Sequence, residues 1–196
     1  MSNQNNKLIC LVGMGGAGKS EVSEYMTKKH NFGYVRFGQI VLDKVKETGQ
    51  PPSEKLEREF REKIRAEHGM AAVAILNLPK IQQLLEEGDV IGDSLYSWEE
   101  YLFLKEKFGD QLKVVAIYAP PAVRYARLEN RGERHGQDEN LRFRSFKLGE
   151  SWERDKAEIE NAHKAGPIAM ADYTVINNCS KEELFCQIDE LLTVLL

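Results

Sequence analysis

The sequence has few cysteines, no long apolar run and no excess of basic residues. Cys10, Cys179 and Cys186 form no C-x-x-C pair, which indicates reduced thiols in a cytoplasm and excludes a disulfide framework. No apolar segment approaches the ~18 residues that a membrane helix needs, and residues 1–6 are polar, so we expect no membrane span and no signal peptide. The formal net charge of -4 argues against binding of duplex nucleic acid. These absences predict a cytoplasmic protein.

The length and the order of the apolar segments predict a single α/β domain. A chain of 196 residues suits one such domain with insertions. Short apolar runs, typical of buried strands, alternate with helical patterns, and this alternation implies a parallel sheet covered on both faces. We predict a three-layer α/β/α fold whose five parallel strands lie at residues 8–12, 34–37, 89–93, 112–118 and 173–176.

Apolar stripes and capping residues predict the helices between these strands. Leu56, Phe60 and Ile64 give one apolar stripe to an otherwise charged helix. Two capping boxes, in which a serine precedes a glutamate by three residues, open the helices after residues 97 and 180. Pro79 predicts an interruption in the helix at residues 70–85. The predicted helices cover residues 19–29, 53–67, 70–85, 97–108 and 152–163 and the segment after residue 180.

The segment after the first strand has the pattern G-x-x-x-x-G-K-S. A strand before it and a helix after it are the context that this phosphate-binding motif needs. Its glycines let backbone N–H groups converge on an anion, Lys19 supplies charge to the β- and γ-phosphates, and the Ser20 hydroxyl ligates Mg²⁺. The motif predicts an ATP and Mg²⁺ site, although ATPases, GTPases and kinases share it. Its residues are Gly13, Met14, Gly15, Gly16, Ala17, Gly18, Lys19 and Ser20.

Asp93 ends the third predicted strand. In a parallel sheet its carboxylate emerges at the same edge as the glycine-rich loop, where ligands gather. There it could hold a Mg²⁺ water or orient the acceptor, and the alternative is a surface aspartate in a turn. Asp89 precedes the apolar residues, so we expect it at the far end of the strand.

Arginines recur at helical spacing after the fourth strand. Their fork-shaped donors suit the charge that develops in phosphoryl transfer, and a segment that closes over the nucleotide would exclude water. The alternative is a solvated helix with Glu129 and Glu133 as partners, and function is favoured for Arg127 and Arg131. The arginines are Arg124, Arg127, Arg131 and Arg134, followed by Arg142 and Arg144.

A second arginine series lies on the charged helix at residues 53–67. Arg58 and Arg61 each have a glutamate four residues earlier, the pairing typical of exposed helices. Arg65 has no such partner and is the candidate of the three for an acceptor phosphate.

The order of these parts resembles the nucleoside monophosphate kinases of the P-loop NTPase fold, adenylate kinase in particular. It resembles more closely an adenylate-kinase-related P-loop family common in archaea. The resemblance runs nearly end to end and is carried by residues 13–20, 36–40, 64–72, 90–94, 115–120, 127–131, 152–155 and 171–173.

The resemblance implies functional regions within one domain, residues 1–196. Residues of about 38 to 75 would form a helical acceptor-binding insertion, and about 125 to 150 would form the lid. Arg127 and Arg131 match the R-[LI]-x-x-R that opens the adenylate kinase lid, where the first stacks near the donor base and the second reaches phosphates. Arg154 would be a further phosphate-facing arginine. Arg36, Gly38 and Arg65, with Arg154, are the predicted acceptor contacts.

The sequence departs from its relatives at two places. Relatives often carry an arginine soon after the acid of the third strand, but residues 94–97 contain none. Either Arg36 or Arg65 supplies the acceptor-phosphate contact instead, or the acceptor is a different one. Dephospho-CoA kinases usually carry an Asp-x-Asp element after the second strand, and residues 36–38 contain no carboxylate. A hydroxyl acceptor would therefore lack its expected base, which favours an acceptor that is already an ionised phosphate.

The expected activity is transfer of the ATP γ-phosphate to a nucleoside monophosphate or a close analogue. The first alternative is a dephospho-CoA kinase or another kinase of a small-molecule hydroxyl. The second is an ATPase or nucleotide switch that acts with a macromolecular partner. The acceptor, the oligomeric state and the choice of ATP over GTP stay open, although no clear N-K-x-D guanine element occurs.

Overall fold

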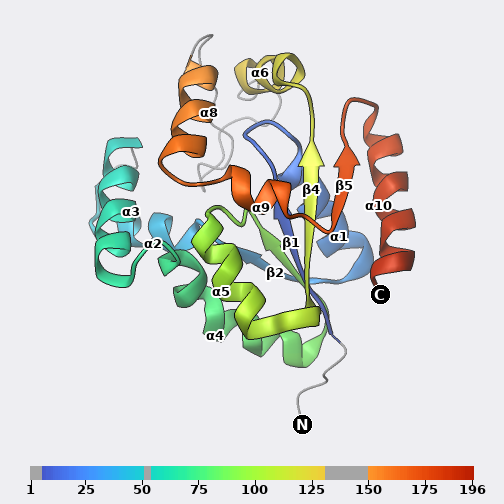
Figure 1. The fold of residues 1–196 in the computed structure, drawn as a ribbon, viewed down its shortest axis with the longest axis horizontal. Helices are drawn as coiled ribbons and strands as arrows, with labels where there is room; N and C mark the ends of the chain where they lie inside the picture. The colour runs from blue at the N-terminus through green and yellow to red at the C-terminus, as the bar shows by residue number, and fades with distance from the viewer. Residues whose placement is uncertain (1–5, 51–53, 131–149) are drawn as a thin grey trace.

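A five-stranded parallel sheet forms the centre of the molecule (Figure 1). The computed structural model describes residues 6–50, 54–130 and 150–196. The strand order is β2-β3-β1-β4-β5, and each neighbouring pair is parallel. This confirms the predicted α/β fold with five parallel strands. The strands are β1 Leu8–Val12, β2 Gly33–Arg36, β3 Val90–Asp93, β4 Leu112–Tyr118 and β5 Tyr173–Ile176.

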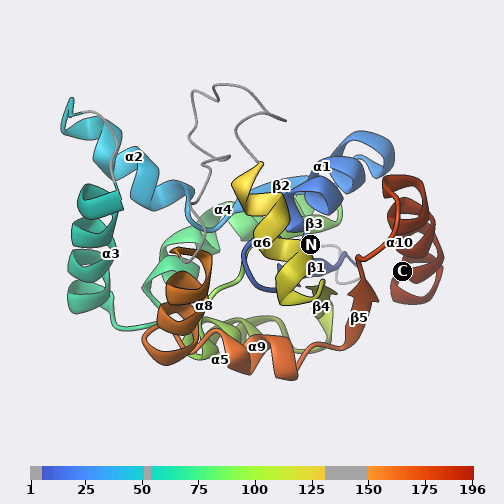
Figure 2. The same ribbon diagram turned by 90° about the horizontal axis from the view of Figure 1, so that it is seen from above.

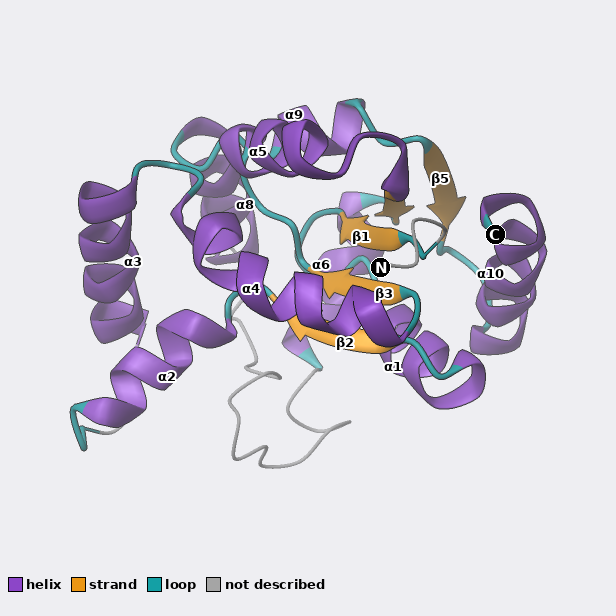
Figure 3. Ribbon diagram, turned by 90° about the horizontal axis from the view of Figure 1, so that it is seen from below, coloured by secondary structure: helices purple, strands orange, loops and turns teal. Residues whose placement is uncertain are grey.

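The sheet alternates its side chains between two cores, as a pleated strand must. Leu8, Cys10 and Val12 of β1 face one core, whereas Ile9 and Leu11 face the other. The first core is completed by α4 (Ala72–Glu87) and α5 (Trp98–Phe108), and the second by α1 (Lys19–His30) and α10 (Lys181–Leu195). Figure 3 shows the sheet between α5 and α9 (Ala165–Ala169) on one side and α1 on the other.

The helices are connected to the strands in the order expected for crossover units. In the part of the chain that the structure describes, no helix is long and apolar enough to cross a membrane. The helices are α1 Lys19–His30, α2 Gln39–Glu47, α3 Glu54–His68, α4 Ala72–Glu87, α5 Trp98–Phe108, α6 Pro121–Glu129, α8 Glu150–Glu160, α9 Ala165–Ala169 and α10 Lys181–Leu195.

The predicted interruption at Pro79 is wrong, because α4 runs through it from Ala72 to Glu87. Proline removes one hydrogen bond from a helix interior. The residues on both sides of it are nevertheless held by the first core, in which Ala74 and Ile81 are fully buried. The packing of both halves against the sheet therefore outweighs the lost hydrogen bond.

A helical arm extends from one edge of the sheet. Helices α2 and α3 stand to the side of the strands (Figure 2), and they join α4 through a small core of Val41, Ile64 and Ala72. Phe60 packs against the same core, so the predicted apolar stripe of α3 faces the protein. The arm occupies most of the region predicted as an acceptor-binding insertion, and that role stays a prediction.

Candidate functional site

The glycine-rich loop joins β1 to α1 at the carboxyl edge of the sheet. Gly13 has φ +138°, and a Cβ there would lie 2.3 Å from the carbonyl oxygen of Ile117. Gly18 has φ +105°, and its Cβ would lie 2.2 Å from the side-chain nitrogen of Asn177. Both positions therefore exclude any side chain, for backbone as well as for packing reasons. The geometry agrees with the loop shape that the sequence motif predicts.

Lys19 is buried at the start of α1 with its ammonium turned back over the loop. Nζ donates to the carbonyl oxygens of Gly13 at 2.8 Å and Met14 at 3.2 Å. Burial, and then the charge of Lys164, lower the pKa of Lys19 to about 7. The ammonium is thus held close to the backbone of the loop, in a buried environment where a bound anion would stabilise its positive charge.

Asp93 lies at the sheet edge that carries the glycine-rich loop, which is the position that the sequence predicts. It is buried at the end of β3, in register with Leu11 of β1. Its Oδ2 accepts from the Tyr34 hydroxyl at 3.0 Å and from Ser23 Oγ at 3.5 Å, and Oδ1 accepts from Ser94 Oγ at 2.9 Å. Since Ser23 also bonds the backbone oxygen of Ser20, the carboxylate and the predicted Mg²⁺ ligand share one small region.

Asp89 lies at the opposite end of the same strand. Its Oδ1 accepts from the backbone N–H of Lys7 at 2.6 Å, before β1 begins. Of the two acids, Asp93 is therefore the one at the loop end of β3, and Asp89 lies at the far end, where the sequence places it. Among the described residues, no group of three or more His, Cys, Asp or Glu side chains could hold a metal ion.

Arg124 braces the loop against α8. Its Nε donates to the carbonyl oxygen of Ala119 at 3.1 Å, and Nη1 donates to that of Gly15 at 3.0 Å. Nη2 forms a buried ion pair with Asp155 at 2.6 Å, and Tyr125 donates to the same carboxylate oxygen. With its three nitrogens engaged in this way, Arg124 holds the loop in position.

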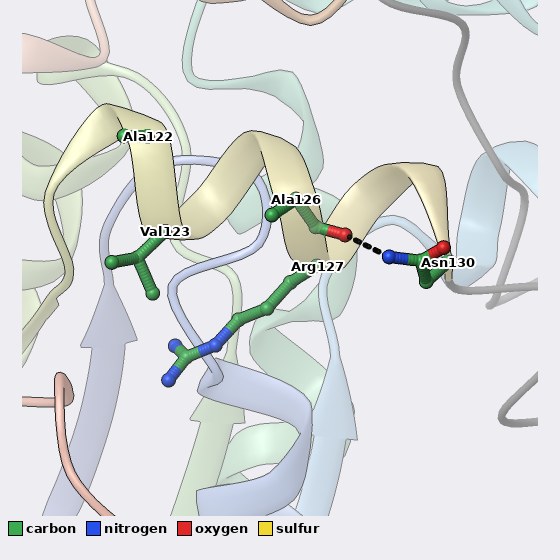
Figure 4. Close-up of a pocket in the computed structure, with 5 residues that line it drawn as sticks. All are labelled: Ala122, Val123, Ala126, Arg127 and Asn130. Atoms are coloured by element: carbon green, nitrogen blue, oxygen red, sulfur yellow. Dashed lines mark hydrogen bonds between the residues drawn. The ribbon is translucent and has the colours of Figure 1, made fainter.

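Arg127 extends from α6 toward the loop, as Figure 4 shows. Its Nη2 donates to Asn177 Oδ1 at 3.3 Å, while Asn177 Nδ2 donates to the carbonyl oxygen of Ala17 at 2.8 Å. Both ends of one buried amide therefore join Arg127 to the loop. Beside this contact is a hollow of about 610 Å³, lined by Ala122, Val123, Ala126, Arg127 and Asn130.

A second polar cluster lies close enough to Lys19 for its charges to affect the pKa of that residue. Glu158 of α8 accepts from Arg154 Nε at 2.9 Å, from Lys164 Nζ at 2.5 Å and from the Tyr96 hydroxyl. The Lys164 ammonium also lies 4.1 Å from the centre of the Tyr96 ring. The cluster therefore brings together α8, the start of α9 and the segment after β3.

Of the remaining predicted site residues, some lie in the described part of the chain and others do not. Arg36 ends β2 in register with Asp93, with Nη1 3.5 Å from Gln39 Oε1. Gly38 precedes α2 with open space around it, so it is not required to be glycine for packing. Arg65 lies near Glu100. Burial raises the pKa of Glu100 to about 7, and the positive charge of Arg65 acts in the opposite direction. Arg131 falls outside the described residues, as do Arg134, Arg142 and Arg144.

Asn177, Tyr96 and Lys164 were not identified from the sequence. Asn177 follows the last strand and Lys164 precedes a five-residue helix, and neither belongs to a motif. The one related signal was the absence of an arginine at residues 94–97, and the replacements that the sequence suggested for it were Arg36 and Arg65.

Comparison with known proteins gives consistent similarities over the whole chain. A family described as "AAA domain" matches residues 9–161. The UPF0200 protein of Pyrococcus furiosus is 32% identical, over 96% of this chain and 97% of the relative. The crystal structure of TT1252 from Thermus thermophilus has a TM-score of 0.59 at 17% identity, covering 97% of this chain and 98% of that chain. A shikimate kinase structure from Bacteroides thetaiotaomicron has a TM-score of 0.57 at 17% identity, covering 95% and 98%.

Proposed function

Because this chain belongs to the UPF0200 family and carries that AAA domain, we propose that it is an ATP-dependent kinase of a small molecule. The observation that supports this most is the loop geometry. Two of its positions admit only glycine, and Lys19 and Asp93 converge beside it. Such a nest of backbone N–H groups at a helix N-terminus suits a polyphosphate.

The residues present fit ATP and Mg²⁺. The Lys19 ammonium, which now bonds carbonyl oxygens of its own loop, would bind the β- and γ-phosphates. Ser20 and Asp93 would hold Mg²⁺, Asp93 through a water molecule. When bound, the ion would neutralise charge on the phosphate oxygens. Arg127, held by Asn177, would contact the donor nucleotide from α6.

We propose further that the acceptor is a nucleoside monophosphate or a similar small nucleotide. The absence of a carboxylate at residues 36–38 supports an acceptor that needs no base. The Asp93 carboxylate already accepts from the Tyr34 and Ser94 hydroxyl groups, and Ser23 Oγ lies 3.5 Å from it, which fits a role in holding water and metal better than one in taking a proton.

The test is a panel of acceptors incubated with Mg²⁺-ATP. The panel contains AMP, CMP, UMP, dTMP, dephospho-CoA and shikimate, with the products resolved by chromatography and Lys19→Ala as the control. A nucleoside diphosphate that is lost in the variant supports the proposal. If a hydroxyl group of dephospho-CoA or shikimate is phosphorylated instead, the acceptor is an alcohol and the proposal of a nucleoside monophosphate is wrong. Free phosphate alone, or ATP binding without turnover, would refute the kinase proposal and favour a nucleotide switch.

A further inference from the structure

Ser94 has a backbone conformation that serine rarely adopts. Its φ is +69°, in the left-handed region that favours glycine. The other described non-glycine residues with a positive φ are Asn31 and His163. Asn31 ends α1, where a left-handed residue is common, whereas Ser94 directly follows β3 at the loop end of the sheet. A side chain that is kept in spite of such backbone strain is a candidate for a functional role.

The side chain of Ser94 is directed at the Asp93 carboxylate. Its Oγ donates to Asp93 Oδ1 at 2.9 Å. Tyr34 of β2 donates to Oδ2 at 3.0 Å, and Ser23 Oγ of α1 lies 3.5 Å from that same oxygen. In the part of the chain that the structure describes, the hydrogen bonds to this carboxylate all come from hydroxyl groups. The donors around Asp93 are therefore neutral, and they come from separate elements of the fold.

Neutral donors orient a carboxylate without cancelling its charge. A carboxylate has about four lone-pair positions, about two on each oxygen. Tyr34 and Ser23 approach Oδ2, whereas Ser94 takes one position on Oδ1, so Oδ1 has room for a further donor such as a water molecule on a metal ion. The backbone of Asp93 is also fixed, because it pairs with β1 on one side and β2 on the other. The Ser94 hydroxyl thus determines the direction of the lone pair that remains on Oδ1.

We propose that Ser94 is a positioning residue, whose hydroxyl orients the Asp93 carboxylate toward the water molecules of the Mg²⁺ ion that is bound with the nucleotide. The left-handed turn places Oγ against Oδ1. Glycine would adopt the same φ without strain but could not supply this donor. The inference rests on the proposed function, which assigns Ser20 and Asp93 to that ion, and it adds to the site a residue outside the glycine-rich motif.

Two substitutions separate the hydroxyl from the turn. Ser94→Gly and Ser94→Ala both remove the donor, but only glycine relieves the backbone strain. Asn31→Gly is the matched control, since it changes another positive-φ residue at the end of α1 that lies away from the loop. For wild type and each variant, calorimetry measures the dissociation constant of ADP in saturating Mg²⁺ and in EDTA. The ratio of the two constants shows how strongly Mg²⁺ and ADP stabilise each other's binding. Thermal unfolding gives the Tm of each protein.

We expect this ratio to fall about tenfold in both Ser94 variants, which is the lower end of the range for groups that orient a metal ligand. The affinity for ADP in EDTA should stay at the wild-type value, because the loop and Lys19 are unaltered. Ser94→Gly should nevertheless unfold about 2–4 °C above Ser94→Ala, since it avoids the strain of a side chain at positive φ. Asn31→Gly should keep the wild-type ratio.

A role of Ser94 in the turn alone predicts a different pattern. Ser94→Gly would then keep the wild-type ratio, and only the more strained Ser94→Ala would reduce it. That pattern would overturn the inference, and so would a wild-type ratio in both variants. If Ser94→Ala does not fold, Ser94→Gly still decides, because glycine preserves the turn and lacks only the hydroxyl.

The same measurements keep this inference distinct from the proposed function. If wild type binds ADP equally well in Mg²⁺ and in EDTA, the assignment of Mg²⁺ to Asp93 is wrong and the role of Ser94 falls with it. If Ser94→Gly lowers the ratio but wild type phosphorylates no acceptor of the panel, the positioning role stands and the kinase proposal fails. If an acceptor is phosphorylated and Ser94→Gly keeps the wild-type ratio, the kinase stands and the positioning role fails.

Discussion

Breaking the buried Arg124–Asp155 pair should destabilise the protein far more than breaking an exposed pair. The two side chains are 6% and 7% exposed, and their atoms are 2.6 Å apart. In Arg124→Met the Asp155 carboxylate keeps the Tyr125 hydroxyl as donor but loses its counter-charge. The carbonyl oxygens of Gly15 and Ala119 lose a donor as well. Removing one partner of a buried pair costs about 3–5 kcal/mol, so we expect a loss of that size in the free energy of unfolding.

The matched control is the exposed pair Lys28–Glu24, whose side chains are 74% and 56% exposed. Water and salt screen such a pair, so Glu24→Gln should cost less than about 0.5 kcal/mol. Urea unfolding of both variants, followed by tryptophan fluorescence, gives the free energies from midpoints and slopes. The expected fall in Tm for Arg124→Met is about 6–20 °C.

A double variant tests whether the loss comes from an uncompensated charge. In R124M/D155N no charge is left buried, so its cost should be clearly smaller than the sum of the two single variants. The reasoning is refuted if Arg124→Met is no more destabilising than Glu24→Gln, or if the two single variants add without interaction.

The other predictions concern the loop itself. Burial and then the charge of Lys164 lower the pKa of Lys19 to about 7, so the free protein loses this positive charge as the pH rises above 7. The affinity for Mg²⁺-ATP should therefore fall by up to about tenfold per pH unit in that range. Calorimetry at pH 8 in buffers of different ionisation enthalpy should show proton uptake on binding in wild type and none in Lys19→Ala. Asn177→Ala leaves the buried carbonyl oxygen of Ala17 without its donor and should weaken ATP binding by about 1–3 kcal/mol. Displacement of a fluorescent nucleotide measures this affinity. An unchanged affinity would contradict the role of Asn177 in joining Arg127 to the loop. Gly13→Ala should abolish ATP binding, since its Cβ would lie 2.3 Å from a backbone oxygen, whereas Gly38→Ala, in open space, should leave ATP binding unaltered.

The parts of the site that lie in one segment could be predicted from the sequence. The motif and its flanking strand and helix are local, and Asp93 follows from the apolar strand before it. The boundaries of β4 and β5 were also predicted, because short apolar runs between breakers leave few alternatives. Even the place of Asp93 at the loop edge of the sheet follows from parallel pairing.

The parts that depend on side chains from distant segments could not be predicted. Asn177 meets Ala17 across 160 positions, and Tyr96 meets Glu158 across 62. No periodicity encodes such contacts, since they are created when the strands take the order β2-β3-β1-β4-β5. Pro79 is an example in which a local sequence signal gave a wrong prediction. Its local effect is unfavourable, but tertiary packing of α4 determines the outcome.

The position of Asn177 and Lys164 matters for anyone who shortens this protein. The AAA domain match ends at residue 161, and both residues follow it. A fragment cut at that boundary would keep the complete phosphate-binding motif but would lose β5, α10 and the amide that joins the loop to Arg127. It would also expose Val115 and Ile117, which pack with Val175 and α10 in the second core. Such a fragment would retain the sequence signature of a nucleotide-binding protein while lacking the means to keep that site in shape.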